Sequence, residues 1–504
     1  MCRYRRTLAD LMASEHYGTV ATVAHEHGLK VYGEALEDNR PLIHTSVHQP
    51  LDDKVPALSL FIFGQYFNRH ETWAEMARSW VDYLARSSFM LQQGRNFADV
   101  AYFYGEEAPL TGLFGDKLIA DAPTRYGYDF INADALMNHT SVAGGELVAK
   151  GGARYKVLYL GGSSRRMTLP LLRRIAGLAE AGATVVGNAP ESSPSLNDDK
   201  AEFAALVRCL WSGGPVTTVG QGKVLASKDV EASLASMNVA ADFSYTKSQA
   251  DSEALFLHRR LEAGDVYFIS NRKQRAERFE ARFRVAGKTP EIWRADTGAC
   301  EPVSYRIEGG TTFIPLDMES DESLFVVFRR SADATSAEIK KATLSPVANI
   351  DGSWNIAFQS GRGAPASIKL DSLGSLSEHA DAGVKYFSGV ATYTHTFRLP
   401  KGNRPGAPLF LDLGEVRDVA EMYANGKRVG TVWHAPYRID IGGAVKAGRN
   451  QLEVRVANLW VNRLIGDAQA EASKVTYTAL PAYRADAPLR RSGLIGPVQL
   501  FRPD

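Results

Sequence analysis

The chain has few cysteines and no long apolar run, so its sequence offers little for disulfide cross-links, structural metal sites or membrane insertion. Its 504 residues include only three cysteines, Cys2, Cys209 and Cys300, which lie far apart and form no Cys-x-x-Cys pair. We therefore expect neither a disulfide framework nor a zinc site. No apolar run approaches the roughly 18 residues that a membrane-spanning helix needs. The basic start of the chain has no long apolar stretch behind it, so a signal peptide is not expected.

An excess of charge of one sign is also lacking. Basic residues number 58 and acidic residues 57, which gives a formal net charge of +1. Such a balance creates no long-range field toward nucleic acid or an anionic membrane, so neither is expected as a partner. The apolar share of 45% and the charged share of 23% are typical of globular domains.

The hydrophobic pattern divides the chain into α/β and all-β parts. At roughly 100–200 residues per domain, the length predicts about three domains. Helical and strand patterns alternate up to about residue 260, and strand patterns dominate after it. We predict a partial (β/α) barrel over 1–150, a Rossmann-like βαβ domain over 151–260, a β-sandwich over 261–335, a linker within 331–350 and a jelly roll over 351–504.

Two strand patterns end in the same three residues, Tyr-Gly-Glu. One reaches Glu34 and the other reaches Glu106, and each follows a helical pattern. The carboxyl ends of parallel strands carry the chemistry of barrels and open α/β sheets. A pair of carboxylates there suits glycoside hydrolysis, with a separation of about 5–5.5 Å for retention and about 6.5–9.5 Å for inversion. The alternative is that both glutamates are solvated turn residues.

Further polar residues in this region could contact a sugar. The candidate substrate-binding residues are His44, His48, Asn68, Arg69, His70, Glu71, Trp73 and Tyr104. His44 and His48 could also bind a metal, but no third ligand is evident. For the run from Asn68 to Trp73, a helix N-terminal cap with Trp73 in the core is an equally good interpretation.

One connection in this region breaks the β/α rule. Residues 42–47 form a strand pattern, and only about seven residues separate it from Glu34. A crossover between parallel strands takes a dozen or more residues, usually including a helix. The sequence therefore predicts either a missing β/α unit or an irregular architecture. Three or four strands can be counted, too few for an eight-stranded barrel of about 250 residues.

The second predicted unit has little that indicates nucleotide binding. A strand over 155–160 leads through Gly161 and Gly162 to a helix over 170–181. The Gly-x-Gly-x-x-Gly motif is absent, because Arg165 and Arg166 occupy the place of its third glycine. We therefore predict a structural or oligomer-forming domain.

Alternating patterns describe the all-β part. Strands are expected over 265–270, 279–285, 290–293, 311–316, 323–328, 392–399, 408–413 and 451–458. In the last unit, Asn425-Gly426 between two short strand patterns is the strongest hairpin signal.

The runs 63–73 and 102–109 resemble glycoside hydrolase family 106, the α-L-rhamnosidases. The resemblance covers nearly the whole chain, including the run 33–38 near its start and the run 386–389 in its last unit. The last unit is also similar to the galactose-binding-like jelly roll of family 2 sugar-binding domains.

The resemblance implies a β/α-barrel enzyme that removes terminal α-L-rhamnose from glycans or glycosides with inversion. It implies two catalytic glutamates, which Glu34 and Glu106 fit best, and a calcium ion that contacts the sugar. Our working assignment makes Glu34 the acid and Glu106 the base, although the sequence leaves the reverse open. Glu37 and Asp38 could hold a cation, whereas a solvated acidic loop is the simpler interpretation. Full-length members are often exported, but no location is assigned to this chain.

Two departures from the family pattern leave other functions open. The family is far longer at its N-terminus, and it places further β/α units between the regions of Arg40 and Ile43. The alternative is therefore a catalytically inactive remnant that binds carbohydrate. Another barrel hydrolase, such as a β-galactosidase-like enzyme, is a third hypothesis. An oligomer is possible in each case.

Overall fold

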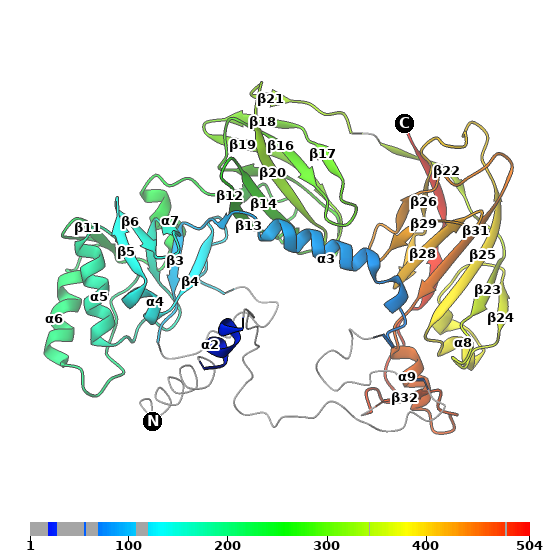
Figure 1. Cartoon of the computed structure of the whole chain (residues 1–504), viewed down its shortest axis with the longest axis horizontal. Coiled ribbons are helices and arrows are strands. Elements are labelled where there is room, and N and C mark those ends of the chain that lie inside the picture. Colours follow the sequence, from blue (N-terminus) through cyan, green and yellow to red (C-terminus); the bar gives the residue numbers. More distant parts are fainter. Residues whose placement is uncertain (1–18, 28–54, 57–68, 107–118, 342, 479–480) are drawn as a thin grey trace.

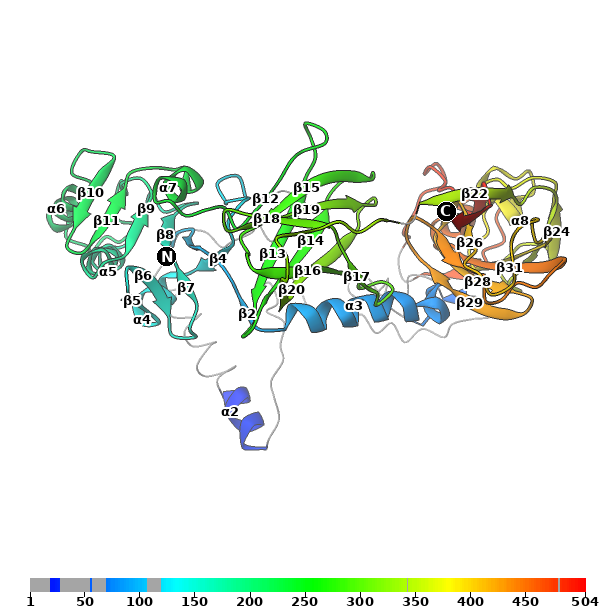
Figure 2. The same ribbon diagram turned by 90° about the horizontal axis from the view of Figure 1, so that it is seen from above.

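The computed structural model describes residues 19–27, 55–56, 69–106, 119–341, 343–478 and 481–504. Three folded units follow one another along an arc, and helix α3 (Arg78–Leu91) runs from the second to the third (Figure 1). From above, the units form a row with α3 along one side of the second (Figure 2). Before α3 the described elements are α2 (Thr19–Glu26), β1 (Val55–Pro56) and the 3₁₀ turn η2 (Ala74–Met76). Within the described ranges, no helix is long and apolar enough to cross a membrane.

The first unit is an open six-stranded sheet with the order β10-β11-β9-β8-β3-β4. Its strands are β3 (Val100–Phe103), β4 (Tyr128–Ile131), β8 (Val157–Leu160), β9 (Thr184–Val186), β10 (Val216–Val219) and β11 (Gly222–Leu225). All neighbours are parallel except β10 and β11. Apolar cores lie on both faces, which explains why β3 and β8 are continuous apolar runs.

Helices cover both faces of this sheet. The core on one face includes α4 (Ala133–Asn138), α5 (Leu169–Glu180) and α6 (Lys200–Leu210), and the core on the other includes α7 (Val230–Ser236). A small antiparallel sheet of β5 (Thr140–Ala143), β6 (Glu146–Ala149) and β7 (Arg154–Tyr155) lies beside the helices of the first face. The sequence predicted β3, β8 and α5 of this unit, but it assigned β3 to a different unit from β8 and α5.

The structure corrects the prediction that β3 and β4 belong to a barrel. β3 pairs in parallel with β8, from Val100 opposite Val157 to Phe103 opposite Leu160. The predicted boundary at residue 150 therefore cuts through a single sheet. The other strands predicted for a partial barrel precede residue 69 and, like the strand pattern over 42–47, lie outside the described residues.

The second unit is an antiparallel β-sandwich. One sheet has the order β12-β15-β19-β18-β21 and the other β17-β16-β20-β14-β13-β2. The strands are β2 (Arg95–Asn96), β12 (Phe243–Tyr245), β13 (Ala254–Arg260), β14 (Asp265–Asn271), β15 (Glu277–Phe283), β16 (Lys288–Trp293), β17 (Cys300–Pro302), β18 (Tyr305–Glu308), β19 (Thr311–Met318), β20 (Ser323–Ser331) and β21 (Ser336–Ala337). Because β12 and β13 join this unit, it begins before residue 261, where the sequence placed its start.

Helix α3 covers the outer face of the second sandwich sheet. Its Met90 shares an apolar cluster with Val266 and Phe325, and Arg86 donates to two backbone carbonyls of the sandwich at 2.8 and 2.9 Å. The chain then turns at Gly94, where φ is +57° and a Cβ would lie 2.1 Å from a backbone oxygen. Glycine is therefore required at this turn.

The opposite face of α3 carries apolar side chains that face solvent. Val81 is 47% exposed, Leu84 40% and Phe89 63%. Leu84 lies three residues and Phe89 eight residues after Val81, spacings that place all three on one side of the helix. Large apolar side chains exposed together on one helix face are less common on a soluble monomer than single scattered ones.

The third unit consists of two antiparallel sheets, with the orders β24-β23-β25-β31-β28-β29 and β22-β34-β26-β30. Its elements are β22 (Leu344–Asn349), β23 (Trp354–Phe358), β24 (Ser367–Leu370), η3 (Leu376–Glu378), α8 (Ala382–Lys385), β25 (Val390–Arg398), β26 (Phe410–Asp412), β27 (Glu415–Arg417), β28 (Val419–Ala424), β29 (Lys427–Val432), β30 (Arg438–Asp440), β31 (Arg449–Ala457), α9 (Val461–Asp467), β32 (Thr476–Tyr477), β33 (Gly493–Gly496) and β34 (Gln499–Pro503). The predicted hairpin joins β28 to β29, with positive φ at Asn425 and Gly426. The predicted linker is partly structured, since it contains β21 and β22.

Two adjacent residues of α3 test whether its outer face contributes to stability. We expect Phe89→Ser to change the free energy of unfolding by about 0.5 kcal/mol or less, because the ring is largely solvated. Met90→Ala, at a buried neighbour, should cost about 2–5 kcal/mol. Urea denaturation measures both values. A large loss of stability for Phe89→Ser would show that another part of the protein covers this face.

Candidate functional site

The candidate residues fall into three groups. Glu34, His44, His48 and Asn68 lie outside the described residues. Tyr104 and Glu106 follow β3 in the first unit, whereas Arg69, His70, Glu71 and Trp73 precede α3 beside the third unit. The 14 residues of α3 lie between the two described groups, and a helix of that length extends about 21 Å. The described residues therefore do not come together as one site.

Glu106 caps the first turn of α5 from a different element. Its carboxylate accepts two hydrogen bonds from Thr168, at 2.7 Å from the backbone nitrogen and 3.1 Å from the hydroxyl. Thr168 is the N-cap residue of α5, and its own side chain makes no capping hydrogen bond. A glutamate at the N-cap N–H is half of a capping box, and its charge also favours the positive end of the helix dipole. Both carboxylate oxygens of Glu106 thus accept hydrogen bonds from the N-cap residue of α5.

The strand end beside Glu106 is docked on the turn that follows β8. The carbonyl oxygen of Tyr104 accepts hydrogen bonds from the backbone N–H of Ser163 at 2.7 Å and from its hydroxyl at 3.0 Å. The Tyr104 ring packs edge to face on Phe130, with centroids 5.8 Å apart. At Gly105, φ is +113° and a Cβ would lie 2.1 Å from the Ser163 hydroxyl oxygen. The glycine of this Tyr-Gly-Glu run is therefore explained by close packing.

A second carboxylate, that of Asp121, binds the same turn. It accepts hydrogen bonds from the Tyr102 hydroxyl at 2.5 Å, the backbone N–H of Gly162 at 3.0 Å and the Tyr159 hydroxyl at 3.4 Å. Burial and the nearby Asp121 raise the pKa of Tyr102 and of Tyr159. Both hydroxyls therefore remain protonated donors at neutral pH.

Glu106 and Asp121 occupy the position where this kind of sheet binds anionic ligands. The chain leaves β3 toward β4 on one side of the sheet, and it leaves β8 toward β9 on the other. Ligands of open α/β sheets bind at such a switch point, with phosphates at a helix N-terminus or on backbone N–H groups. Here two carboxylates already accept those hydrogen bonds and would repel a phosphate. The geometry agrees with the absence of the Gly-x-Gly-x-x-Gly motif.

The run from Arg69 to Trp73 docks on the third unit rather than on the sheet. The Trp460 indole N–H donates to the His70 carbonyl at 3.1 Å, and the Thr72 hydroxyl donates to the carbonyl of Asn458. Trp73 packs edge to face on Trp80, with ring centroids 5.9 Å apart. Trp73 is half-buried and makes no side-chain capping hydrogen bond, so the expected place in the core and the expected cap are not what the structure has at this residue.

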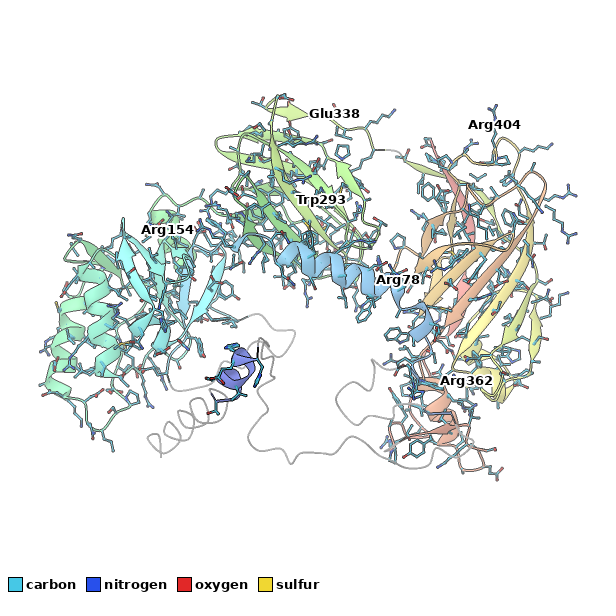
Figure 3. All side chains as sticks on the ribbon, viewed as in Figure 1. Arg78, Arg154, Trp293, Glu338, Arg362 and Arg404 are labelled. Carbon is cyan, nitrogen blue, oxygen red and sulfur yellow. The ribbon has the colours of Figure 1, made fainter. Side chains whose placement is uncertain are left out.

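Burial changes the acid–base properties of this run. The pKa of His70 is lowered by burial and by the nearby charges of Arg69 and Arg362, and Figure 3 shows Arg362 beside α9. Glu71 is only 7% exposed, and its Oε1 has no hydrogen-bond partner among the described residues. Burial raises the pKa of Glu71 to about 7. Glu71 is thus the candidate carboxyl that can keep its proton near neutral pH.

No metal centre is evident in the part of the chain that the structure describes, where no group of three or more His, Cys, Asp or Glu side chains could hold an ion. Glu37 and Asp38, the carboxylates singled out for a cation, lie outside the described residues.

The sequence analysis missed both Thr168 and Asp121. Thr168 had a readable signal, because a threonine two residues before Pro170 is typical of a helix start. Asp121 had none, since it follows no motif and its partners lie on β3, on β8 and in the turn after β8.

The capping contact predicts a stability cost when Glu106 is truncated. We expect Glu106→Ala to lower the free energy of unfolding by about 1 kcal/mol, as for other lost helix caps. It should also speed hydrogen exchange in the first turn of α5. Glu180→Ala at the opposite end of α5 is the matched control, because a negative charge near a helix C-terminus does not stabilise it. Unchanged exchange in Glu106→Ala would contradict the capping role.

The raised pKa of Glu71 predicts a pH-dependent stability. Between pH 4.5, its ordinary pKa, and about 7, the folded state holds a proton that the unfolded state releases, so stability falls as pH rises. One pKa unit corresponds to about 1.4 kcal/mol. The free energy of unfolding of Glu71→Gln should therefore exceed that of the wild type by up to about 3 kcal/mol at pH 8 and equal it near pH 4. Urea denaturation at both pH values measures this, with exposed Glu75→Gln as the control. An equal difference at both pH values would rule out the titration of Glu71.

Comparison with known proteins shows which family the chain resembles. A family model described as alpha-L-rhamnosidase matches residues 1–42 and 38–307, and a model of the glycosyl hydrolase 2 galactose-binding domain-like family matches residues 379–490. The structure of a rhamnosidase from Novosphingobium sp. PP1Y is 50% identical, with a TM-score of 0.87 over 99% of this chain. A protein named putative beta-glucuronidase, from Formosa agariphila, is 25% identical over 94% of this chain.

Both relatives are longer than this chain. The chain covers 56% of the Novosphingobium protein and 61% of the Formosa protein. The family match nevertheless includes more than half of this chain, and the structural match includes nearly all of it. The chain belongs to glycoside hydrolase family 106, the α-L-rhamnosidase family.

Proposed function

We propose that this chain is a glycoside hydrolase that removes terminal α-L-rhamnose from glycans or glycosides. The observation that carries the proposal is the 50% identity to a solved rhamnosidase, at a TM-score of 0.87 over 99% of the chain. Because the chain covers 56% of that protein, the activity of the longer relative does not transfer without a test.

The proposed chemistry is inversion by two carboxylates. One carboxylic acid protonates the leaving oxygen, and a carboxylate about 6.5–9.5 Å away activates a water molecule. Glu34 and Glu106 are the proposed pair. Glu106 would have to release Thr168 to act as a base, and hydrogen bonds to a charged group are worth about 1.5–3 kcal/mol each. Its capping contacts therefore oppose the catalytic role. Of the two glutamates, Glu34 is the better candidate for a catalytic carboxylate.

Calcium is a further part of the proposal. Carboxylate oxygens are the ligands that calcium prefers, and Glu37 and Asp38 are the residues that would supply them. If the ion contacts the sugar, its removal should raise KM for the rhamnoside without a matching loss of protein stability.

A second candidate function is carbohydrate binding without turnover. Two observations favour it: both oxygens of Glu106 are engaged, and α3 separates the two described groups of candidate residues. In that case the β domains would supply the binding surface.

An assay with 4-nitrophenyl α-L-rhamnoside, with calcium or with a chelator, separates the two functions. We expect turnover that falls by a factor of about 10²–10⁴ in Glu34→Gln, the usual contribution of a general acid or base. Glu75→Gln is a control at an exposed residue of η2. A panel of other aryl glycosides would reveal a different hydrolase. Absence of turnover by well-folded protein, together with rhamnoside binding by calorimetry, would overturn the hydrolase in favour of the binding protein.

In the same assay, Glu106→Gln distinguishes the two roles of that residue. The amide keeps an acceptor for the Thr168 N–H, so the fold should survive with a modest loss of stability. Full turnover in this variant would exclude Glu106 as the base. Loss of turnover at unchanged stability would support the catalytic pair.

A further inference from the structure

A polar cavity of about 220 Å³ lies at one end of the third unit, beside the start of α9. Three segments line it: the β27–β28 junction, the connection from β31 into α9, and the residues that precede β33. Its polar lining residues are Arg417, Asp418, Asn458, Asn462, Arg490, Arg491 and Ser492. Drug-sized ligands take pockets of about 300–1,000 Å³. The volume therefore suits a ligand of about one sugar ring.

The inner wall of the cavity is rigid. Asn462 holds the backbone of Arg490 from both sides, donating to its carbonyl at 2.7 Å and accepting from its N–H at 2.9 Å. Asn458 donates to the Ser492 hydroxyl at 2.6 Å and to the Phe387 carbonyl at 2.8 Å. Each of these asparagines is 3% exposed. The backbone that carries Arg490 is thus fixed before any ligand arrives.

The charged groups of the cavity are unequally paired. Arg417 and Arg491 share the carboxylate of Glu415, the first at 3.0 Å. Arg490 is exposed, and its guanidinium makes no hydrogen bond or ion pair with the described residues. Burial raises the pKa of Asp418 above its ordinary value, although the positive charges of Arg417 and, more weakly, Arg490 act to lower it. The lining carries three guanidinium groups and one carboxylate, that of Asp418, whereas Glu415 pairs with two of the guanidinium groups from outside the lining. The cavity therefore has an excess of positive charge.

We propose that this cavity binds a uronic acid unit of an acidic, rhamnose-containing polysaccharide. The uronate carboxylate would pair with the planar fork of Arg490, which matches carboxylate geometry bidentately. Asp418 would accept a hydrogen bond from a ring hydroxyl. Terminal rhamnose has no carboxylate, so this subsite takes a different unit from the one hydrolysed.

The inference adds a substrate class to the proposed function, but its test measures binding rather than turnover. A failure here leaves the rhamnoside assay unaffected, and a failed rhamnoside assay does not decide the binding of uronate.

The test is calorimetric titration of the full chain with D-glucuronate, D-glucose and acetate at low salt. We expect glucuronate to bind at least tenfold more tightly than either glucose or acetate, because it alone offers both the carboxylate and the hydroxyls. The interaction should weaken as salt is added, since the ion pair is partly solvated.

Two arginine variants of the same domain complete the experiment. Arg490→Gln should weaken glucuronate binding at least tenfold at an unchanged melting temperature, because the exposed guanidinium has no described partner. Arg404→Gln, at an exposed arginine that does not line the cavity and is labelled in Figure 3, should bind as the wild type does. Equal binding of glucose would reveal a neutral-sugar site, and equal binding of acetate a nonspecific anion site. Either result, no binding, or an unaffected Arg490→Gln would overturn the proposal.

Discussion

Parallel hydrogen bonding between β3 and β8 is the constraint on which the rest of the first unit depends. All four side chains of β3 are completely buried, and their neighbours on β8 are buried as well. This pairing brings the end of β3 to the turn before α5. It therefore places Glu106 on the N-terminus of that helix and Asp121 on the β8 turn. A strand end that was predicted to be catalytic thus also makes structural contacts.

Buried charges join the first unit to the sandwich. Arg284 of the sandwich pairs with Asp99 at 2.7 Å, and Asp99 is 1% exposed. His258 lies between Asp242 at 3.0 Å and Asp265 at 2.9 Å, and these two carboxylates keep its pKa raised despite burial. Removing one member of such a set leaves an uncompensated buried charge, which is far more costly than losing a surface pair. The network therefore fixes how the two units meet.

Helix α3 joins the second unit to the third in a different way. Its inner face packs on the sandwich, and its Tyr83 ring packs against Trp433 of the third unit, with ring centroids 5.3 Å apart. Its outer face stays apolar and exposed. The exposed face of α3 and the polar cavity beside α9 are two described surfaces that the packing of the units leaves open.

The sequence by itself determined the local elements and the family. Periodicity, capping residues and Asn425-Gly426 predicted most strands, α5 and the hairpin, because these depend on residues close together in the chain. Only the tertiary structure decided which strands share a sheet, since β3 and β8 are separated by β4 and the small β5–β7 sheet. The role of Glu106 followed from that pairing: a glutamate after a strand looks the same in a sequence whether it faces a substrate or a helix N-terminus. The hydrogen bonds between Asn462 and the backbone of Arg490 likewise join residues 28 positions apart, and no local sequence pattern predicts them.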